Sequence, residues 1–207
     1  GADRSPAWSP DGSQIVFSRE TVDGSSLYLV DTDCISPDAP CEDALVLVTS
    51  DRYDLFPAWS PDGTRIAFAA SDFPGLPSVI ALVAPQELTP VNLPGTGASD
   101  FYPAWSPDGA RIAFVSILSG DYNLFTMSAW TGGELLQITG SPGSDVGPAW
   151  SVDGSRLAFA SDRDGQGFDL YVAASACPSS RPGCEDGLSQ LTRNPGDELD
   201  PRWLPGG

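Results

Sequence analysis

Pro6-Ala-Trp-Ser-Pro-Asp-Gly12 recurs without change at Pro57–Gly63 and at Pro103–Gly109. A fourth copy, Pro148–Gly154, differs by one residue, and a fifth, Pro201–Gly207, keeps only part of the pattern. A repeat with a period of about 45 to 55 residues indicates one supersecondary unit copied in series, and this determines the architecture of the chain. The period is marked by the tryptophans Trp8, Trp59, Trp105, Trp150 and Trp203.

The third copy shows what one repeat contains. Four short apolar runs, residues 102–106, 111–116, 123–127 and 135–139, alternate with breaks rich in glycine, proline and aspartate. Runs of this length with such breaks predict strands arranged as an antiparallel meander. The Asp-Gly step at 108–109 favours a tight hairpin, because glycine reaches positive φ without a Cβ clash. No stretch has sustained helical periodicity, so almost no helix is expected.

A four-stranded unit of this length has the size of one propeller blade. We therefore predict an all-β propeller of four-stranded antiparallel blades in a single domain spanning residues 1–207. The repeated tryptophans are expected on the first strand of each blade, in the core between neighbouring blades. Four complete blades are expected at residues 3–53, 54–99, 100–144 and 145–197, followed at 198–207 by the first strand of a further blade or a closing strand.

A fifth copy of the first strand does not fit a closed ring of four blades. Two interpretations follow: a self-contained four-bladed ring, or, as we favour, a fragment or subunit that associates. Open first and last blades expose strand edges or apolar faces, and both features promote association.

The pattern D-x-x-P-A-W-S-P-D-G-x-x-I-A-F, followed by S-D-R-D-G, D-L-Y and L-T, resembles the TolB-type propeller repeat, a relative of the WD-type repeat. The resemblance covers essentially the whole chain. It implies that the PAWS strand is innermost and the L-T strand outermost. Such repeats occur in periplasmic TolB, in propeller domains of large peptidases, in some polysaccharide lyases and in many surface proteins. Nothing in this chain matches the separate amino-terminal domain of TolB, so the partner of TolB is not carried over.

The composition excludes several classes of function. The net charge is −18, from 28 acidic and 10 basic residues, and the sequence contains no histidine. Such a surface repels phosphate, so neither nucleic acid nor an anionic membrane is an expected partner, and no apolar stretch is long enough for membrane insertion. All the basic residues are arginine, so nucleophile mechanisms that need histidine or lysine cannot operate. Only catalysis by paired carboxylates survives this test, and we predict no catalytic residue and no enzymatic activity.

The four cysteines form two pairs with the same spacing, Cys34 with Cys41 and Cys177 with Cys184. In both pairs the second cysteine begins the sequence Cys-Glu-Asp, and the pairs occupy equivalent loops of the first and fourth blades. We predict the local disulfides Cys34–Cys41 and Cys177–Cys184, with zinc as the less favoured alternative because the loops lack histidine. Disulfides indicate an oxidising compartment, and therefore a secreted, periplasmic or cell-surface protein.

An acidic residue precedes each innermost strand by three positions. Its recurrence in every copy favours a structural role, in which the carboxylate accepts hydrogen bonds from nearby backbone and orders the loop. The functional alternative is that these acids surround the mouth of the channel and hold a cation or a basic peptide. Trp130 lies outside the repeat on an expected turn, where an exposed aromatic is a candidate contact. The candidate binding face therefore consists of Asp54, Asp100, Asp145, Glu198 and Trp130.

Blade 4 contains a second acidic group, Asp162, Asp164 and Asp169, spread among glycines. Flexible loops with several carboxylates are typical calcium ligands, so these residues are a candidate calcium site. The competing interpretation is an ordinary turn of the repeat, because Ala173 stands where an EF-hand loop would supply its last carboxylate. No cofactor is expected to be required.

The function that we predict is a non-enzymatic extracellular or periplasmic module that binds a protein partner, or its own copies, through an acidic loop face. Loops held on a rigid scaffold are the usual place for binding. Two alternatives stay open: a structural subunit of a surface assembly or filament, and the propeller fragment of a larger hydrolase or glycan-active carboxylate enzyme.

Overall fold

The structure is a computed structural model that describes residues 1–22, 24–34, 41–50, 52–140, 142–177, 180, 187–193 and 196–203. Within these residues lie sixteen strands in four consecutive groups of four, called blades 1 to 4 here. The strands of the first two blades are β1 (Asp3–Trp8), β2 (Gln14–Thr21), β3 (Gly24–Asp31), β4 (Val46–Leu47), β5 (Tyr53–Trp59), β6 (Ile66–Ser71), β7 (Val79–Val83) and β8 (Val91–Asn92). Those of blades 3 and 4 are β9 (Asp100–Trp105), β10 (Arg111–Ser116), β11 (Asn123–Ser128), β12 (Leu136–Gln137), β13 (Asp145–Trp150), β14 (Arg156–Ser161), β15 (Asp169–Ala174) and β16 (Ser189–Gln190).

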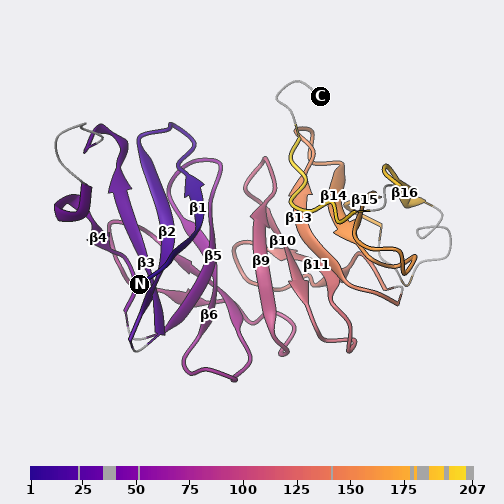
Figure 1. Ribbon diagram of the computed structural model, residues 1–207, viewed down its shortest axis with the longest axis horizontal. Coiled ribbons are helices and arrows are strands. Elements are labelled where there is room, and N and C mark those ends of the chain that lie inside the picture. Colours follow the sequence, from indigo (N-terminus) through magenta and orange to yellow (C-terminus); the bar gives the residue numbers. More distant parts are fainter. Residues whose placement is uncertain are drawn as a thin grey trace.

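Each blade is an antiparallel meander in which successive strands pair in chain order (Figure 1). One parallel pair of residues, Ser25 and Tyr53, joins β3 to β5, so blades 1 and 2 share one hydrogen-bonded sheet. The described residues contain no α-helix, only two short 3-10 helices, η1 (Thr32–Cys34) and η2 (Cys41–Ala44). The predicted all-β class and four-stranded antiparallel units are therefore confirmed.

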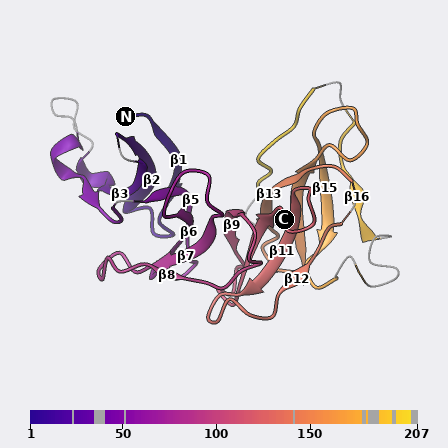
Figure 2. The same cartoon turned by 90° about the horizontal axis from the view of Figure 1, so that it is seen from below.

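The blades follow one another along an arc (Figure 2). The innermost strands β1, β5, β9 and β13 pack against one another in that order, so they line the concave side. Blades 1 and 4 occupy the two ends of the arc, and no sheet closes on itself in the described part of the chain.

The hairpin between the first two strands of each blade is built in the same way in all four copies. In blade 2 the Ser60 hydroxyl donates a 2.6 Å hydrogen bond to Asp62 Oδ1, and the same oxygen accepts the Thr64 amide at 3.0 Å. Gly63 follows with φ 70°, as the turn requires. These hydrogen bonds stabilise the ionised form and lower the pKa of Asp62 to about 2. The repeated Ser-x-Asp-Gly stretch, in which x is proline in three copies and valine in the fourth, is therefore a self-contained turn.

The hydrophobic core lies between blades. Ile80 and Leu82 of blade 2 pack with Ile112, Phe114 and other buried residues of blade 3 in one cluster. Equivalent clusters join blades 1 and 2, and blades 3 and 4. Each blade therefore depends on its neighbours to remove its apolar faces from water.

Three of the repeated tryptophans, Trp105, Trp150 and Trp203, donate their indole N–H to the blade before them, whereas the buried indole N–H of Trp59 has no hydrogen-bond partner among the described residues. Trp105 Nε1 donates to the Ala58 carbonyl at 3.1 Å, and Trp150 Nε1 donates to the Ala104 carbonyl at 3.0 Å. Trp105 is buried, as predicted, but Trp8 is 60% exposed, which corrects the expectation that every copy is core. The reason is position, because no blade precedes blade 1 in the structure to cover its inner strand.

The fifth copy continues this pattern at the other end of the arc. Trp203 Nε1 donates to the Ala149 carbonyl of blade 4 at 3.0 Å. This hydrogen bond is equivalent to the one that Trp150 donates to Ala104 of blade 3. Residues 198–203 have no strand pairing, and 204–207 lie outside the described residues. The fifth tryptophan therefore takes the place of an inner-strand tryptophan on the face of blade 4.

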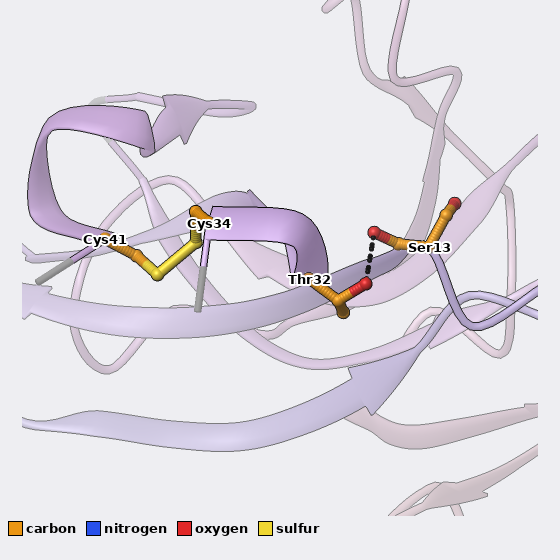
Figure 3. The surroundings of a disulfide bond; sticks show 4 residues. All are labelled: Ser13, Thr32, Cys34 and Cys41. Atoms are coloured by element: carbon orange, nitrogen blue, oxygen red, sulfur yellow. Dashed lines mark hydrogen bonds between the residues drawn. A yellow bond between two sulfur atoms is a disulfide. The ribbon is translucent and has the colours of Figure 1, made fainter. Parts of the chain in front are cut away.

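The loop between β3 and β4 carries the predicted disulfide. Cys34 and Cys41 are joined with their Cα atoms 5.5 Å apart, and the Thr32 hydroxyl beside them donates to the Ser13 carbonyl at 3.1 Å (Figure 3). The disulfide thus closes a loop that is already hydrogen-bonded to the β1–β2 hairpin. The second predicted disulfide, Cys177–Cys184, involves Cys184, which lies outside the described residues.

Candidate functional site

A groove of about 780 Å³ runs along the concave side of the arc. All four innermost strands line it, together with the segment 199–202 that precedes Trp203. Each strand contributes the same short stretch, the residue before the first proline of the repeat, then proline, alanine and, in blades 1 to 3, tryptophan. The groove is therefore a surface that all the repeats build jointly.

The residue before that proline has an unusual backbone conformation in every copy. Ser5, Phe56, Tyr102 and Asp200 have φ between 50° and 55°, and Gly147 has φ 64°. In blades 1 to 4 the register of the first two strands shifts beside this residue, which marks a β-bulge. Positive φ at a residue other than glycine costs on the order of 1–3 kcal/mol and is concentrated at functional sites. Four strained residues thus line one groove.

Two of these residues form the aromatic part of the groove. The rings of Phe56 and Tyr102 lie with centroids 4.0 Å apart, although the residues belong to different blades. Burial raises the pKa of the Tyr102 hydroxyl, and the charge of Asp200 raises it further. The tyrosine is still 36% exposed, so one side of the pair faces the groove. The groove therefore combines an aromatic platform with a carboxylate.

Sequence reasoning missed this groove, although a signal was present. The residue before the repeated proline changes from copy to copy, while the proline, the tryptophan and the glycine of the hairpin stay almost constant. A variable position inside a constant motif indicates a side chain that the fold does not require. The five residues are Ser5, Phe56, Tyr102, Gly147 and Asp200.

The structure corrects the predicted acidic face. Asp54, Asp100 and Asp145 are at most 1% exposed, so their carboxylates do not form a surface for a partner. Asp100 accepts hydrogen bonds from the amide and the hydroxyl of Thr96, at 3.1 and 2.6 Å. These contacts match the structural interpretation, in which the acid orders its own loop.

The other two buried acids have arginine neighbours. Asp145 Oδ1 accepts a 2.8 Å hydrogen bond from Arg163. Asp54 lies 3.6 Å from Arg52 Nε, and burial raises its pKa to about 6 despite this positive charge. Glu198 is half-buried, and its amide donates to the Phe168 carbonyl at 2.7 Å. The four acids therefore have four different environments.

Trp130 is exposed, as its position outside the repeat predicts, with 70% of its surface accessible. Its ring stacks on the guanidinium of Arg65 from blade 2, with 4.1 Å between Arg65 Cζ and the ring centroid. On its other side the same guanidinium lies 5.1 Å from the Trp105 ring. The arginine is thus held between two indoles, an arrangement that attracts the cation electrostatically.

The three candidate calcium residues form no common cluster; Asp164 and Asp169 meet only at the side-chain amide of Gln190, which donates to both, at 3.4 and 3.1 Å. Asp162 accepts the Ser144 amide, Asp164 accepts the Gln166 amide, and Asp169 is buried and bonded to the Gln190 amide group. Over the residues that the structure describes, no three acidic, histidine or cysteine side chains are grouped closely enough to hold a metal ion. This geometry favours the turn interpretation over a calcium loop.

A family model described as the TolB beta propeller domain matches residues 36–182. No curated protein matches the chain. Among the described residues, no helix is long and apolar enough to cross a membrane.

Among solved structures, TolB from Acinetobacter baumannii aligns with a TM-score of 0.71 and 19% identity, covering 92% of this chain and 43% of TolB. A putative TolB from Agrobacterium tumefaciens aligns with a TM-score of 0.72 and 23% identity, covering 93% of this chain and 62% of the other. A puromycin-hydrolyzing peptidase of Mycobacterium tuberculosis aligns at 0.65 and 17%, covering 87% of this chain and 31% of the peptidase. The chain thus spans less than two thirds of each of these proteins, and at such identities the likeness concerns the fold.

Proposed function

Since this chain belongs to the TolB beta propeller domain family, we propose that it is a non-enzymatic binding module that holds a segment of a protein partner in its central groove. The observation that carries the proposal is the left-handed residue that every repeat contributes to the groove, which is strained in all copies except the fourth, where it is Gly147. Strain of this kind persists only where the surrounding fold imposes it.

The chemistry of the groove suits a peptide. Aromatic side chains supply most of the binding energy at many protein interfaces, and the stacked pair Phe56 and Tyr102 is held by two different blades. Proline follows each variable residue, so the groove wall loses little conformational entropy when a ligand binds. Asp200 and Arg202 add polar groups at one end, where a peptide backbone or a charged side chain finds partners.

The net charge of −18 favours a partner segment that carries basic residues. We therefore expect association to become weaker as salt increases, because ions screen the attraction. The Cys34–Cys41 disulfide favours a place outside the cytoplasm, in the periplasm or at the cell exterior.

Selection of peptides from a displayed random library against the whole chain tests the proposal. Selected peptides are titrated against wild type, Tyr102→Ser and Phe73→Ser; the last removes an aromatic that is 65% exposed and lies outside the groove lining. We expect Tyr102→Ser to weaken binding about tenfold or more, as loss of an aromatic hot spot does. We expect Phe73→Ser to bind like wild type. Peptides that bind both variants as they bind wild type would contradict the groove as the site.

One observation favours self-association as a second candidate function. Trp8 is exposed on blade 1, whereas at the far end of the arc Trp203 is docked on blade 4. An exposed inner-strand tryptophan is typical of a surface that another blade covers. Sedimentation velocity of wild type and Trp8→Ser over a range of concentrations tests this candidate; a wild type that is monomeric at every concentration contradicts it.

A further inference from the structure

Two equivalent clefts lie between the hairpin turns of neighbouring blades, one between blades 2 and 3 and one between blades 3 and 4. Ser60, Asp62 and Arg65 form one wall of the first cleft, and Ser106, Asp108 and Arg111 occupy the same repeat positions in the second. The opposite wall contains Trp105 in the first cleft and Trp150 in the second. The two clefts are therefore built from the same parts of the repeat.

The first cleft is lined by an indole of the protein itself, although that indole is 70% exposed. Trp130 lies in it, stacked at 4.1 Å on Arg65, and the remaining volume is about 270 Å³. Trp105 also lines this cleft and is 9% exposed. An indole is therefore a ligand that this cleft geometry accepts.

The second cleft lacks this indole. Pairing within each blade places Met127 opposite Ile112 and Ala173 opposite Leu157, so three residues later Ala176 stands at the position of Trp130. The cleft has a volume of about 710 Å³, and Trp150 at its base is only half-buried. Ala176 thus lines the second cleft at the repeat position where Trp130 places an indole in the first.

The open cleft has apolar walls and a fixed cation. Leu135 and Val152 line it and are 41% and 51% exposed, and Val152 replaces the proline of the other Ser-Pro-Asp-Gly turns. Arg111 is held in place by the Thr126 hydroxyl at 2.9 Å and by Glu134, whose backbone carbonyl it also contacts at 2.9 Å. Hydrogen bonds in the plane of a guanidinium leave its faces available for stacking on an aromatic ring.

We propose that the cleft between blades 3 and 4 binds an aromatic side chain of a protein partner, an indole above all, in the place that Trp130 occupies in the neighbouring cleft. The ring stacks on Arg111 and packs against Leu135 and Val152 in the cleft that Trp150 also lines. This site shares no lining residue with the central groove, so it is a second contact point.

Titration with 5-fluoro-N-acetyltryptophanamide, followed by fluorine NMR, tests the proposal on the whole chain. We expect saturable binding to wild type and at least about tenfold weaker binding to Ala176→Trp, which places an indole in the cleft. Val152→Asp changes an exposed side chain and should also weaken binding, so the test does not depend on one bulky substitution. Trp130→Ala should add a second site by emptying the first cleft.

Two controls separate this site from the others. Tyr102→Ser alters the groove and should leave probe binding unchanged, so loss of binding in that variant alone would assign the probe to the groove and overturn the inference. N-acetylleucinamide should bind more weakly than the tryptophan probe, because it cannot stack on Arg111. Binding that Ala176→Trp and Val152→Asp leave unchanged, or a Trp130→Ala variant that gains no second site, would also overturn it.

Discussion

Blade 1 and blade 3 have nearly the same sequence at their innermost strands, yet their equivalent residues are in different environments. Trp105 is buried and donates a hydrogen bond to blade 2, whereas Trp8 is 60% exposed. Asp100 is fully buried, whereas Asp3 is exposed and pairs with Arg19 at 2.6 Å. The comparison teaches that burial in this fold is supplied by the preceding blade: blade 2 covers blade 3, whereas blade 1 stands at the end of the arc in this structure.

The largest expected effect is a difference in stability between two variants, each of which removes one of these tryptophans. Trp105→Ala should lower the free energy of unfolding by about 3–5 kcal/mol, because it leaves a cavity between blades and removes the indole hydrogen bond to the Ala58 carbonyl. Trp8→Ala should cost less than about 1 kcal/mol, as surface substitutions do. Urea denaturation of both variants measures the difference, and equal losses would break the comparison.

Disulfides provide the second test, because the cysteines occur only in blades 1 and 4, at the ends of the arc. Replacing Cys34 and Cys41 with serine should destabilise the protein by about 2–3 kcal/mol on the chain-entropy model. Amide hydrogen exchange should rise in β3 and β4 first and much less in blade 3, whose core has blades on both sides. Uniformly faster exchange in all four blades would show that the ends are no less stable than the middle.

The pH dependence of two equivalent acids should have opposite signs. Burial raises the pKa of Asp54 to about 6, so its ionisation destabilises the folded state as pH rises from about 4 through 6. Asp54→Asn should therefore be more stable than wild type at pH 7, by about 1–3 kcal/mol, and equal to it near pH 4. The Arg19 hydrogen bond lowers the pKa of exposed Asp3, so Asp3→Asn should lose stability at neutral pH, by less than about 1 kcal/mol.

Thermal unfolding between pH 4 and 8 measures both differences. A stability gap between Asp54→Asn and wild type that does not grow with pH would contradict the assignment of the buried carboxylate. A gain in stability at neutral pH from Asp3→Asn would contradict the contrast between the two blades.

The smallest effect concerns the strained residues of the groove. Ser5→Gly should stabilise the protein by up to about 1 kcal/mol, because glycine tolerates positive φ. Tyr102→Gly relieves the same strain but loses the ring contact with Phe56, so no net gain is expected. Melting temperatures suffice for this test, and a clear gain in both variants would mean that the aromatic pair contributes nothing.

Much of the fold was predictable from local pattern. The strand runs, the Ser-Pro-Asp-Gly turns and the position of Trp130 outside the repeat depend on short-range chemistry, which a single repeat displays completely. The candidate site was not predictable in the same way. The groove brings together Phe56 and Tyr102 from different blades, and the predicted acids Asp54, Asp100 and Asp145 are buried by packing that no local pattern reveals.

The amino-acid sequence alone determined the meander, its fourfold recurrence and the spacing of the cysteines. These features follow from residue-by-residue preferences for strands and turns, which each copy repeats. Only the tertiary structure decided which of several equivalent residues are exposed, paired or strained. The physical reason is that every blade face is completed by another blade, so identical sequence has a different environment at the end of the arc than in its middle.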